Sequence, residues 1–164
     1  MTDKGQGTMN WIDELKNLLG DCVRTDKATL QAHAGDKWHA AALPEAVVLA
    51  TSTEAVSTAM KVAYAHGVPV TPRGAGVGYV GGCVPVRGGL VISTASMTRI
   101  VEVNPADGVA VAEAGVLTAD LQEACARVGW FYPPDPASRK ESSIGGNIAT
   151  NAGGPRCLKY GVTR

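Results

Sequence analysis

A glycine-rich stretch between residues 73 and 89 constrains this chain more than any other part of its sequence. Seven of its 17 residues are glycine, where average usage of roughly 7% predicts about one. Glycine lets the backbone reach positive φ and lets another group approach the main chain closely. Successive N–H groups in such a loop can converge on an anion. We interpret residues 73–82, the first glycine segment, as a phosphate cradle with the positive charge of Arg73 at its edge; a mobile surface turn is the alternative.

Residues 76–81 match the G-x-G-x-x-G dinucleotide fingerprint, but the sequence after them does not fit it. In that fingerprint a helix begins directly afterwards, and its N-terminus holds the pyrophosphate. Pro85 and the glycines around it oppose a helix here. A Walker A loop is excluded too, because no Gly-Lys-Ser/Thr follows. A phosphate bound here would therefore be held by the amides of an irregular loop, without a helix dipole.

The composition is that of an ordinary globular domain and excludes several classes of partner. The chain has 164 residues, is 45% apolar and 18% charged, and carries no formal net charge, which suits one domain with its own core. The charge balance argues against nucleic acid or an anionic membrane as the main partner. We find neither a transmembrane stretch nor a signal peptide. The four scattered cysteines form no C-x-x-C pair, so we expect reduced thiols in a cytoplasmic protein and no zinc site.

Apolar periodicity predicts short helices and strands along the chain. A polar, disordered tail over residues 1–9 is expected before a helix over residues 11–19, and residues 20–45 are expected to be irregular. Short apolar runs predict strands at residues 46–50, 68–71, 90–94, 100–103 and 109–113. The order β-α-β, loop, β, β-turn-β and α predicts an α+β fold of small mixed sheets flanked by helices.

Two of the predicted helices are expected to start at threonine caps. Thr51 and Glu54 have the spacing of a capping box, and Thr118 precedes a helix that ends at Gly129. The helix after Thr51 runs to Gly67, and it is expected to turn five side chains inward: Val56, Met60, Val62, Ala63 and Tyr64.

A second glycine segment, residues 142–154, follows the stiff run Pro133-Pro134-Asp135-Pro136. It combines glycine with Ser, Asn and Thr, whose side chains can hydrogen-bond a ligand or nearby backbone. Such a run could line a long cofactor through main-chain contacts; the alternative is a buried loop that satisfies its own backbone groups. No Ser/His/Asp set and no metal cluster is evident, because all three histidines precede both glycine segments. The sequence therefore assigns no catalytic residue.

These motifs occur in an order and spacing that resemble one superfamily. They are Pro44–Val48, Pro72–Gly76, Gly81-Gly82, Glu113–Val116, Pro134–Pro136, Ile144–Gly154 and Lys159–Gly161. Together they resemble the FAD-binding PCMH-type domain of the vanillyl-alcohol oxidase/p-cresol methylhydroxylase superfamily, in the branch that contains glycolate oxidase and D-lactate dehydrogenase. The resemblance covers roughly residues 25–164 and leaves residues 1–24 as an N-terminal tail and helix.

The resemblance implies which residues hold FAD. The pyrophosphate would be wrapped by Pro72, Arg73, Gly74, Ala75, Gly76, Val77, Gly78, Gly81 and Gly82. The rest of FAD, with the flavin ring, would be lined by Pro134, Asp135, Ser143, Ile144, Gly145, Gly146, Asn147, Thr150 and Gly153. Some relatives carry a histidine that bonds covalently to the flavin; Val77 stands there, so non-covalent FAD is expected. Gly78 stands where many relatives have Ser or Thr, so one hydrogen bond worth on the order of 1 kcal/mol is expected to be missing.

The resemblance also implies a reaction, the oxidation of a D-2-hydroxy acid of glycolate or D-lactate type to the 2-oxo acid with hydride transfer to FAD. Family members take substrate-binding groups and the catalytic base from a C-terminal domain. The chain is therefore expected to be an incomplete, C-terminally truncated FAD-binding domain without the substrate (cap) domain, inactive by itself.

Two alternatives to this reaction stay open. One is an FAD domain of an alkylglycerone-phosphate synthase-like or sugar-lactone oxidase-like enzyme. The other is a non-catalytic remnant or interaction module that pairs with another polypeptide. The expected partners are the hydroxy acid and other subunits of an oxidase complex, which would hold this cytoplasmic protein at the inner membrane surface.

Overall fold

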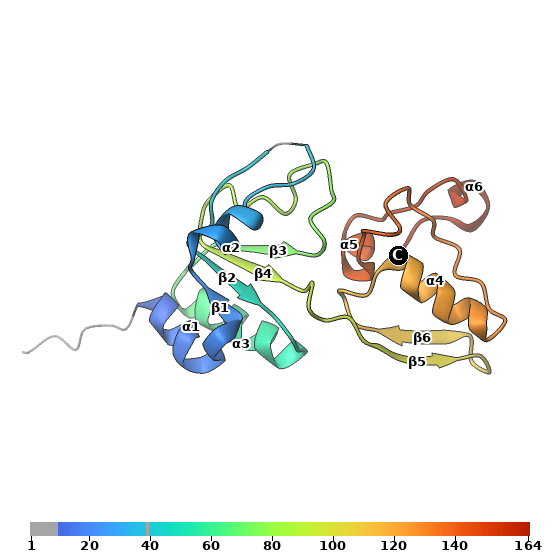
Figure 1. Ribbon diagram of the computed structural model, residues 1–164, viewed down its shortest axis with the longest axis horizontal. Coiled ribbons are helices and arrows are strands. Elements are labelled where there is room, and N and C mark those ends of the chain that lie inside the picture. The colour runs from blue at the N-terminus through green and yellow to red at the C-terminus, as the bar shows by residue number, and fades with distance from the viewer. Residues whose placement is uncertain (1–9, 39) are drawn as a thin grey trace, which may run out of the picture.

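The structure, a computed structural model, describes residues 10–38 and 40–164 and shows two lobes (Figure 1). The first lobe contains α1 (Trp11–Leu19), η1 (Gly20–Cys22), β1 (Val23–Arg24), α2 (Lys27–Ala32), β2 (Ala46–Leu49), α3 (Thr53–Ala65), β3 (Val70–Arg73) and β4 (Leu90–Ser93). The second lobe contains β5 (Ile100–Asn104), β6 (Val109–Ala112), α4 (Thr118–Arg127), α5 (Ile144–Ala149) and α6 (Cys157–Tyr160). The tail expected over residues 1–9 lies outside the described residues.

The first lobe is built on a four-stranded sheet in the order β1-β2-β4-β3. β2, β4 and β3 run parallel, whereas β1 pairs antiparallel with β2. Val48, Leu90 and Ile92 form a core with the fully buried Leu15 of α1. Figure 1 shows α1 and α3 on one side of the sheet and α2 on the other. The helix and strand before residue 25 thus pack within this lobe, and a domain boundary at residue 25 stays a prediction.

Residues 20–45 were expected to be irregular, and this expectation is wrong. They contain η1, β1 and α2. Asp26 caps α2 by accepting a hydrogen bond from the Thr29 amide at 3.0 Å. A two-residue strand and a six-residue helix are too short to show a periodicity in the sequence, so the apolar pattern did not reveal them.

The start and the inner face of α3 also differ from the prediction. Ser52, rather than Thr51, caps the helix by accepting from the Ala55 amide at 3.2 Å. Met60 and Tyr64 are 47% and 91% exposed. The buried residues of α3 are Ala55, Ala59, Val62 and Ala63. Small side chains therefore form the inner face, since they let the helix lie close to the sheet.

The second lobe packs helices on an antiparallel pair of strands. β5 and β6 pair around the turn at residues 105–108, as predicted. Leu121 and Cys125 of α4 pack with Val116 and Ile144 in a separate small core. Thr118 does not cap α4, because Leu117 occupies the N-cap position and the Thr118 hydroxyl donates to the Ser142 carbonyl at 3.1 Å. The α+β fold with more than one small sheet is confirmed.

Candidate functional site

The first glycine segment leaves the sheet at the carboxyl end of β3, beside the carboxyl ends of the parallel strands β2 and β4. Ligands of open parallel sheets bind outside this edge. Residues 74–89 form no helix, which confirms that the segment cannot work as a nicotinamide-type dinucleotide fingerprint. The buried Pro85 lies in the irregular part, as expected.

The backbone amides of residues 74–80 are the main hydrogen-bond donors that this loop offers to a ligand. None of them donates a hydrogen bond to a group in the described part of the chain. Gly76 and Gly81 have positive φ values of 71° and 73°. An added Cβ at Gly78 or Gly82 would meet no atom within 4 Å. The loop therefore offers several unused donors and space for a group to approach them.

Arg73 places a positive charge against this loop. Its guanidinium donates to the Gly35 carbonyl at 2.6 Å, to Cys83 Sγ at 3.3 Å and to the Ala32 carbonyl at 3.4 Å. A Cβ on Gly76 would overlap the guanidinium. Within residues 10–38 and 40–164, no carboxylate lies within ion-pair distance of Arg73. The cation is thus fixed beside the loop by neutral acceptors, and its charge is not neutralised.

The two glycine segments meet in space. A Cβ on Gly74 would lie 2.5 Å from Ser143 Oγ and 3.6 Å from the Gly146 amide nitrogen. Lys37 also forms an ion pair with Glu141 directly before the second segment, and this carboxylate raises the pKa of Lys37. The structure therefore brings the first predicted set of residues against the start of the second.

No helix was predicted within the second glycine segment, and most of its first half is the short helix α5. Ser143 caps the helix and accepts from the Gly146 amide at 3.3 Å. The Ile144 and Gly145 amides donate to the carbonyls of Val116 and Ala114, each at 2.8 Å. Tertiary hydrogen bonds thus stabilise a helix that Gly145 and Gly146 disfavour. These amides are used within the fold, in contrast to those of residues 74–80.

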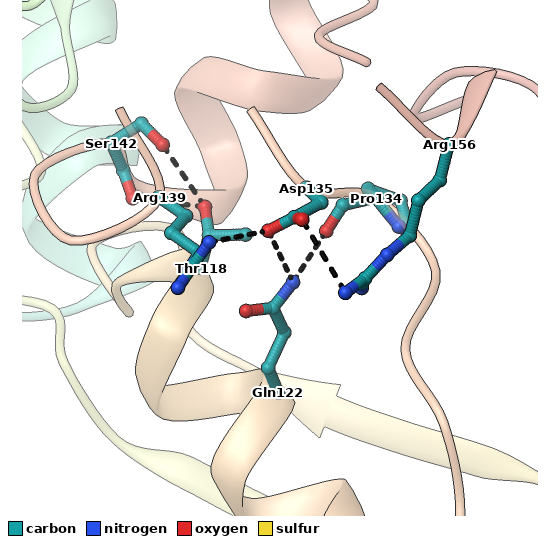
Figure 2. Close-up of polar contacts among 7 residues, drawn as sticks. All are labelled: Thr118, Gln122, Pro134, Asp135, Arg139, Ser142 and Arg156. Carbon is teal, nitrogen blue, oxygen red and sulfur yellow. Dashed lines mark hydrogen bonds and ion pairs between the residues drawn. The ribbon is translucent and has the colours of Figure 1, made fainter. Parts of the chain in front are cut away.

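Asp135 is the centre of a polar cluster shown in Figure 2. Its carboxylate accepts from Arg139 at 3.1 Å and Gln122 at 3.4 Å, and it pairs with Arg156 at 3.5 Å. Gln122 also donates to the Pro134 carbonyl at 2.7 Å. Asp135 is only 9% exposed, so its carboxylate holds the residues around α4 together, and a contact with a cofactor stays a prediction.

The remaining predicted residues also have partners within the second lobe. Asn147 is 2% exposed and donates to Thr118 Oγ1 at 2.5 Å. Thr150 donates to the Gly146 carbonyl at 2.9 Å. The Gly153 carbonyl accepts from the Asp135 amide at 3.0 Å. Their backbone or side-chain groups stabilise the lobe, and a role in holding FAD stays a prediction for each.

A family model described as an FAD binding domain matches residues 44–164. The chain belongs to this FAD-binding domain family. It is 44% identical over 122 residues to glycolate oxidase subunit GlcD of Bacillus subtilis, covering 74% of this chain and 26% of that protein. It is 44% identical over 147 residues to D-lactate dehydrogenase of Anaerostipes hadrus, covering 90% of this chain and 30% of that protein. The chain spans about a third or less of the curated relatives it matches.

Solved structures of FAD-binding domain relatives support the same placement. Alkyldihydroxyacetonephosphate synthase superposes with a TM-score of 0.84 at 26% identity, over 99% of this chain and 32% of that one. p-Cresol methylhydroxylase superposes with a TM-score of 0.73 at 24% identity, over 87% of this chain and 29% of that one, which supports the fold. The expected superfamily, its cofactor FAD and its class of FAD-linked oxidoreductases are confirmed at the level of the family.

Other features of this FAD-binding domain are its histidines and a hollow that borders the second glycine segment at Ile144 and Ile148. His33 contacts the Thr29 carbonyl and His66 contacts Glu14, while His39 falls outside the described residues. An open, largely apolar hollow of about 450 Å³ lies between the β5–β6 pair and α4, and Ile144 is its one predicted site residue. The described residues contain no cluster suited to a metal ion, and none of the described helices could cross a bilayer.

Sequence reasoning missed one part of the site, residues 35–38. These residues contact the first glycine segment at several points. The Gly35-Asp36 pair is a turn signal in the sequence. It gave no indication of the contact partner, which lies 45 residues further along the chain.

Proposed function

We propose that this chain binds FAD non-covalently and forms the FAD-holding part of an oxidoreductase that acts on a D-2-hydroxy acid. The observation that carries the proposal is the set of unused amides at residues 74–80 beside the unpaired charge of Arg73. FAD, when bound, supplies the electron acceptor for the oxidation. The relatives' names, which include D-2-hydroxyglutarate dehydrogenase, support the substrate class.

The residues of the first glycine segment fit a diphosphate. Backbone amides of residues 74–80 would donate to phosphate oxygens, and Arg73 would offset part of the negative charge. Glycine suits position 76 because its φ is positive, and a side chain there would also displace the Arg73 guanidinium. Val77 offers no nucleophile, so this site would hold FAD without a covalent bond.

The second glycine segment would supply the neighbouring wall of the site. Because Gly74 lies against Ser143 and Gly146, a ligand on the first segment would be close to the start of α5. Gly146 lies at the contact with Gly74 of the first segment, whereas Asp135 and Asn147 would act by keeping this wall in place. The groups that bind the substrate and a catalytic base would come from other polypeptide, which includes partner subunits. The four free cysteines suit a cytoplasmic setting.

A synthase of alkyldihydroxyacetonephosphate type is the second candidate, and it is supported by the superposition with a TM-score of 0.84. Sequence favours the first candidate. The relatives named as hydroxy-acid enzymes are 39–44% identical to this chain, against 26–27% for the synthase.

The test is a titration of the purified chain with FAD, in which binding is measured by the quenching of flavin fluorescence. We expect saturable binding by the wild type and at least about tenfold weaker binding by Gly76→Val, since the strained backbone alone costs about 1–3 kcal/mol. Gly67→Val is the matched control. Gly67 has a similar φ of 63° and meets no atom within 4 Å, at the end of α3. Equal FAD affinity in both variants, or no saturable binding by the folded wild type, would contradict the proposal.

A further inference from the structure

Residues 35–38 lie along the first glycine segment and contact it at successive points. The Gly35 carbonyl accepts from Arg73, at the start of the segment, at 2.6 Å. The Lys37 amide donates to the Gly78 carbonyl at 3.2 Å. The rings of Trp38 and Tyr79 meet edge to face, with centroids 6.0 Å apart. This segment precedes the region that the family model matches, which begins at residue 44.

The Asp36 carboxylate makes the contact at the far end of the loop. Its Oδ2 accepts from the Gly81 amide at 2.9 Å, and its Oδ1 accepts from the Trp38 amide at 2.8 Å. One side chain therefore joins its own turn to the loop. Gly81 is the single residue between 74 and 82 whose amide has an acceptor in the described part of the chain.

Gly81 is a position where such a contact matters. Its φ of 73° is one of two positive φ values in the loop, and its carbonyl accepts from the Val84 amide at 3.0 Å. The glycines nearby have many accessible conformations. A charge-assisted hydrogen bond is among the stronger contacts available to fix one of them.

We infer that Asp36 is a positioning residue for the first glycine segment. By holding Gly81, its carboxylate keeps the loop in the conformation in which the amides of residues 74–80 stay available to a diphosphate. The inference rests on the proposed function for its ligand, and it assigns Asp36 no contact with FAD. Its alternative is that the carboxylate acts through its charge, as an anion that competes with phosphate for the loop.

Two substitutions separate positioning from charge. Asp36→Ala removes both acceptor oxygens and the charge. Asp36→Asn removes the charge and keeps one acceptor oxygen, which can take the Gly81 amide or the Trp38 amide but not both. The matched control is Asp107→Ala, because Asp107 likewise holds a turn, through Asn104 at 2.8 Å, in the β5–β6 hairpin of the other lobe. Hydrogen–deuterium exchange of the Gly81 and Val84 amides without FAD, and FAD affinity by fluorescence, are measured for all four proteins.

We expect Asp36→Ala to exchange the Val84 amide, which donates to the Gly81 carbonyl, about tenfold faster than the wild type and to bind FAD about tenfold more weakly. Asp36→Asn, which keeps one of the two acceptor oxygens, should fall between the wild type and Asp36→Ala in both measurements, and Asp107→Ala should leave loop exchange unchanged. Wild-type exchange in Asp36→Ala overturns the inference, as does an asparagine variant as impaired as the alanine variant. If either variant binds FAD more tightly than the wild type, the inference is overturned, and the Asp36 carboxylate instead competes with phosphate for the loop. A wild type that binds no FAD overturns the proposed function and the ligand part of the inference, while the exchange data still decide what Asp36 does to the loop.

Discussion

The two glycine segments have similar compositions and opposite structures. Residues 74–80 form an open loop whose amides have no acceptor in the described part of the chain. In residues 142–154, the first amides of α5 donate to Ala114, Val116 and Ser143. Glycine in the first segment provides positive φ and open space, whereas glycine in the second lets backbone pack against backbone. Whether each amide has an acceptor, more than the number of glycines, separates an open loop from a packed one.

The largest effect is expected where the second segment packs most closely. Gly154 has a φ of 120°, and a Cβ there would overlap the Asp135 carbonyl oxygen. Because that oxygen is backbone, no rotamer relieves the overlap, and Gly154→Ala should lower the free energy of unfolding by about 3 kcal/mol. Gly78→Ala in the first segment, where a Cβ meets nothing within 4 Å, should stay within about 0.5 kcal/mol. Urea unfolding, monitored by circular dichroism, compares the two variants. Equal losses of unfolding free energy would remove the distinction between a packed and an open glycine segment.

A smaller effect is expected inside α5. A Cβ on Gly145 would lie 2.8 Å from the Ala114 Cβ and 3.0 Å from its carbonyl oxygen. Overpacking of about 1–3 kcal/mol should outweigh the gain of about 1 kcal/mol in helix propensity, so Gly145→Ala should destabilise by about 1 kcal/mol. Adding Ala114→Gly removes one side of the clash and should restore part of the loss in the same unfolding assay. A Gly145→Ala protein more stable than the wild type would show that this glycine is not needed for packing.

The smallest expected effect is a pH dependence of stability at Glu113, next to the Ala114 that α5 packs against. Glu113 precedes Ala114 and accepts from the Arg99 side chain at 2.7 and 2.9 Å and from its amide at 2.8 Å. The Arg99 guanidinium, and then its amide, lower the pKa of Glu113. The stabilisation is therefore present above the ordinary glutamate pKa of about 4.3 and is lost as pH falls through the lowered value.

Glu113→Gln should consequently lose less thermal stability than the wild type between neutral pH and about pH 3. Melting temperatures across this range measure the difference. Glu123→Gln, which removes an exposed carboxylate paired with Arg127, is the control. The same fall in melting temperature with pH for the wild type and Glu113→Gln would contradict a stabilising role of the Glu113 carboxylate.

Much of this fold could be predicted, because apolar runs define β2 and β4 and a Pro-Ala-Asp-Gly turn defines the β5–β6 pair. The open loop followed from Pro85, which excludes a helix locally. α5 could not be predicted, since its stability comes from Ala114 and Val116, about 30 residues away. The position of the first glycine segment was evident from composition, whereas Asp36 was not, because its contact with Gly81 depends on the folded chain.

Arg73 gives the molecule a cation whose orientation is set before any ligand arrives. Its guanidinium is held on Gly35, Cys83 and Ala32, so its rotamer freedom is lost during folding. An arginine ordered only on binding would lose about 1–2 kcal/mol of side-chain entropy at that moment. Here the loss occurs during folding, so an anion that bound the loop would meet a charge that needs no reorganisation.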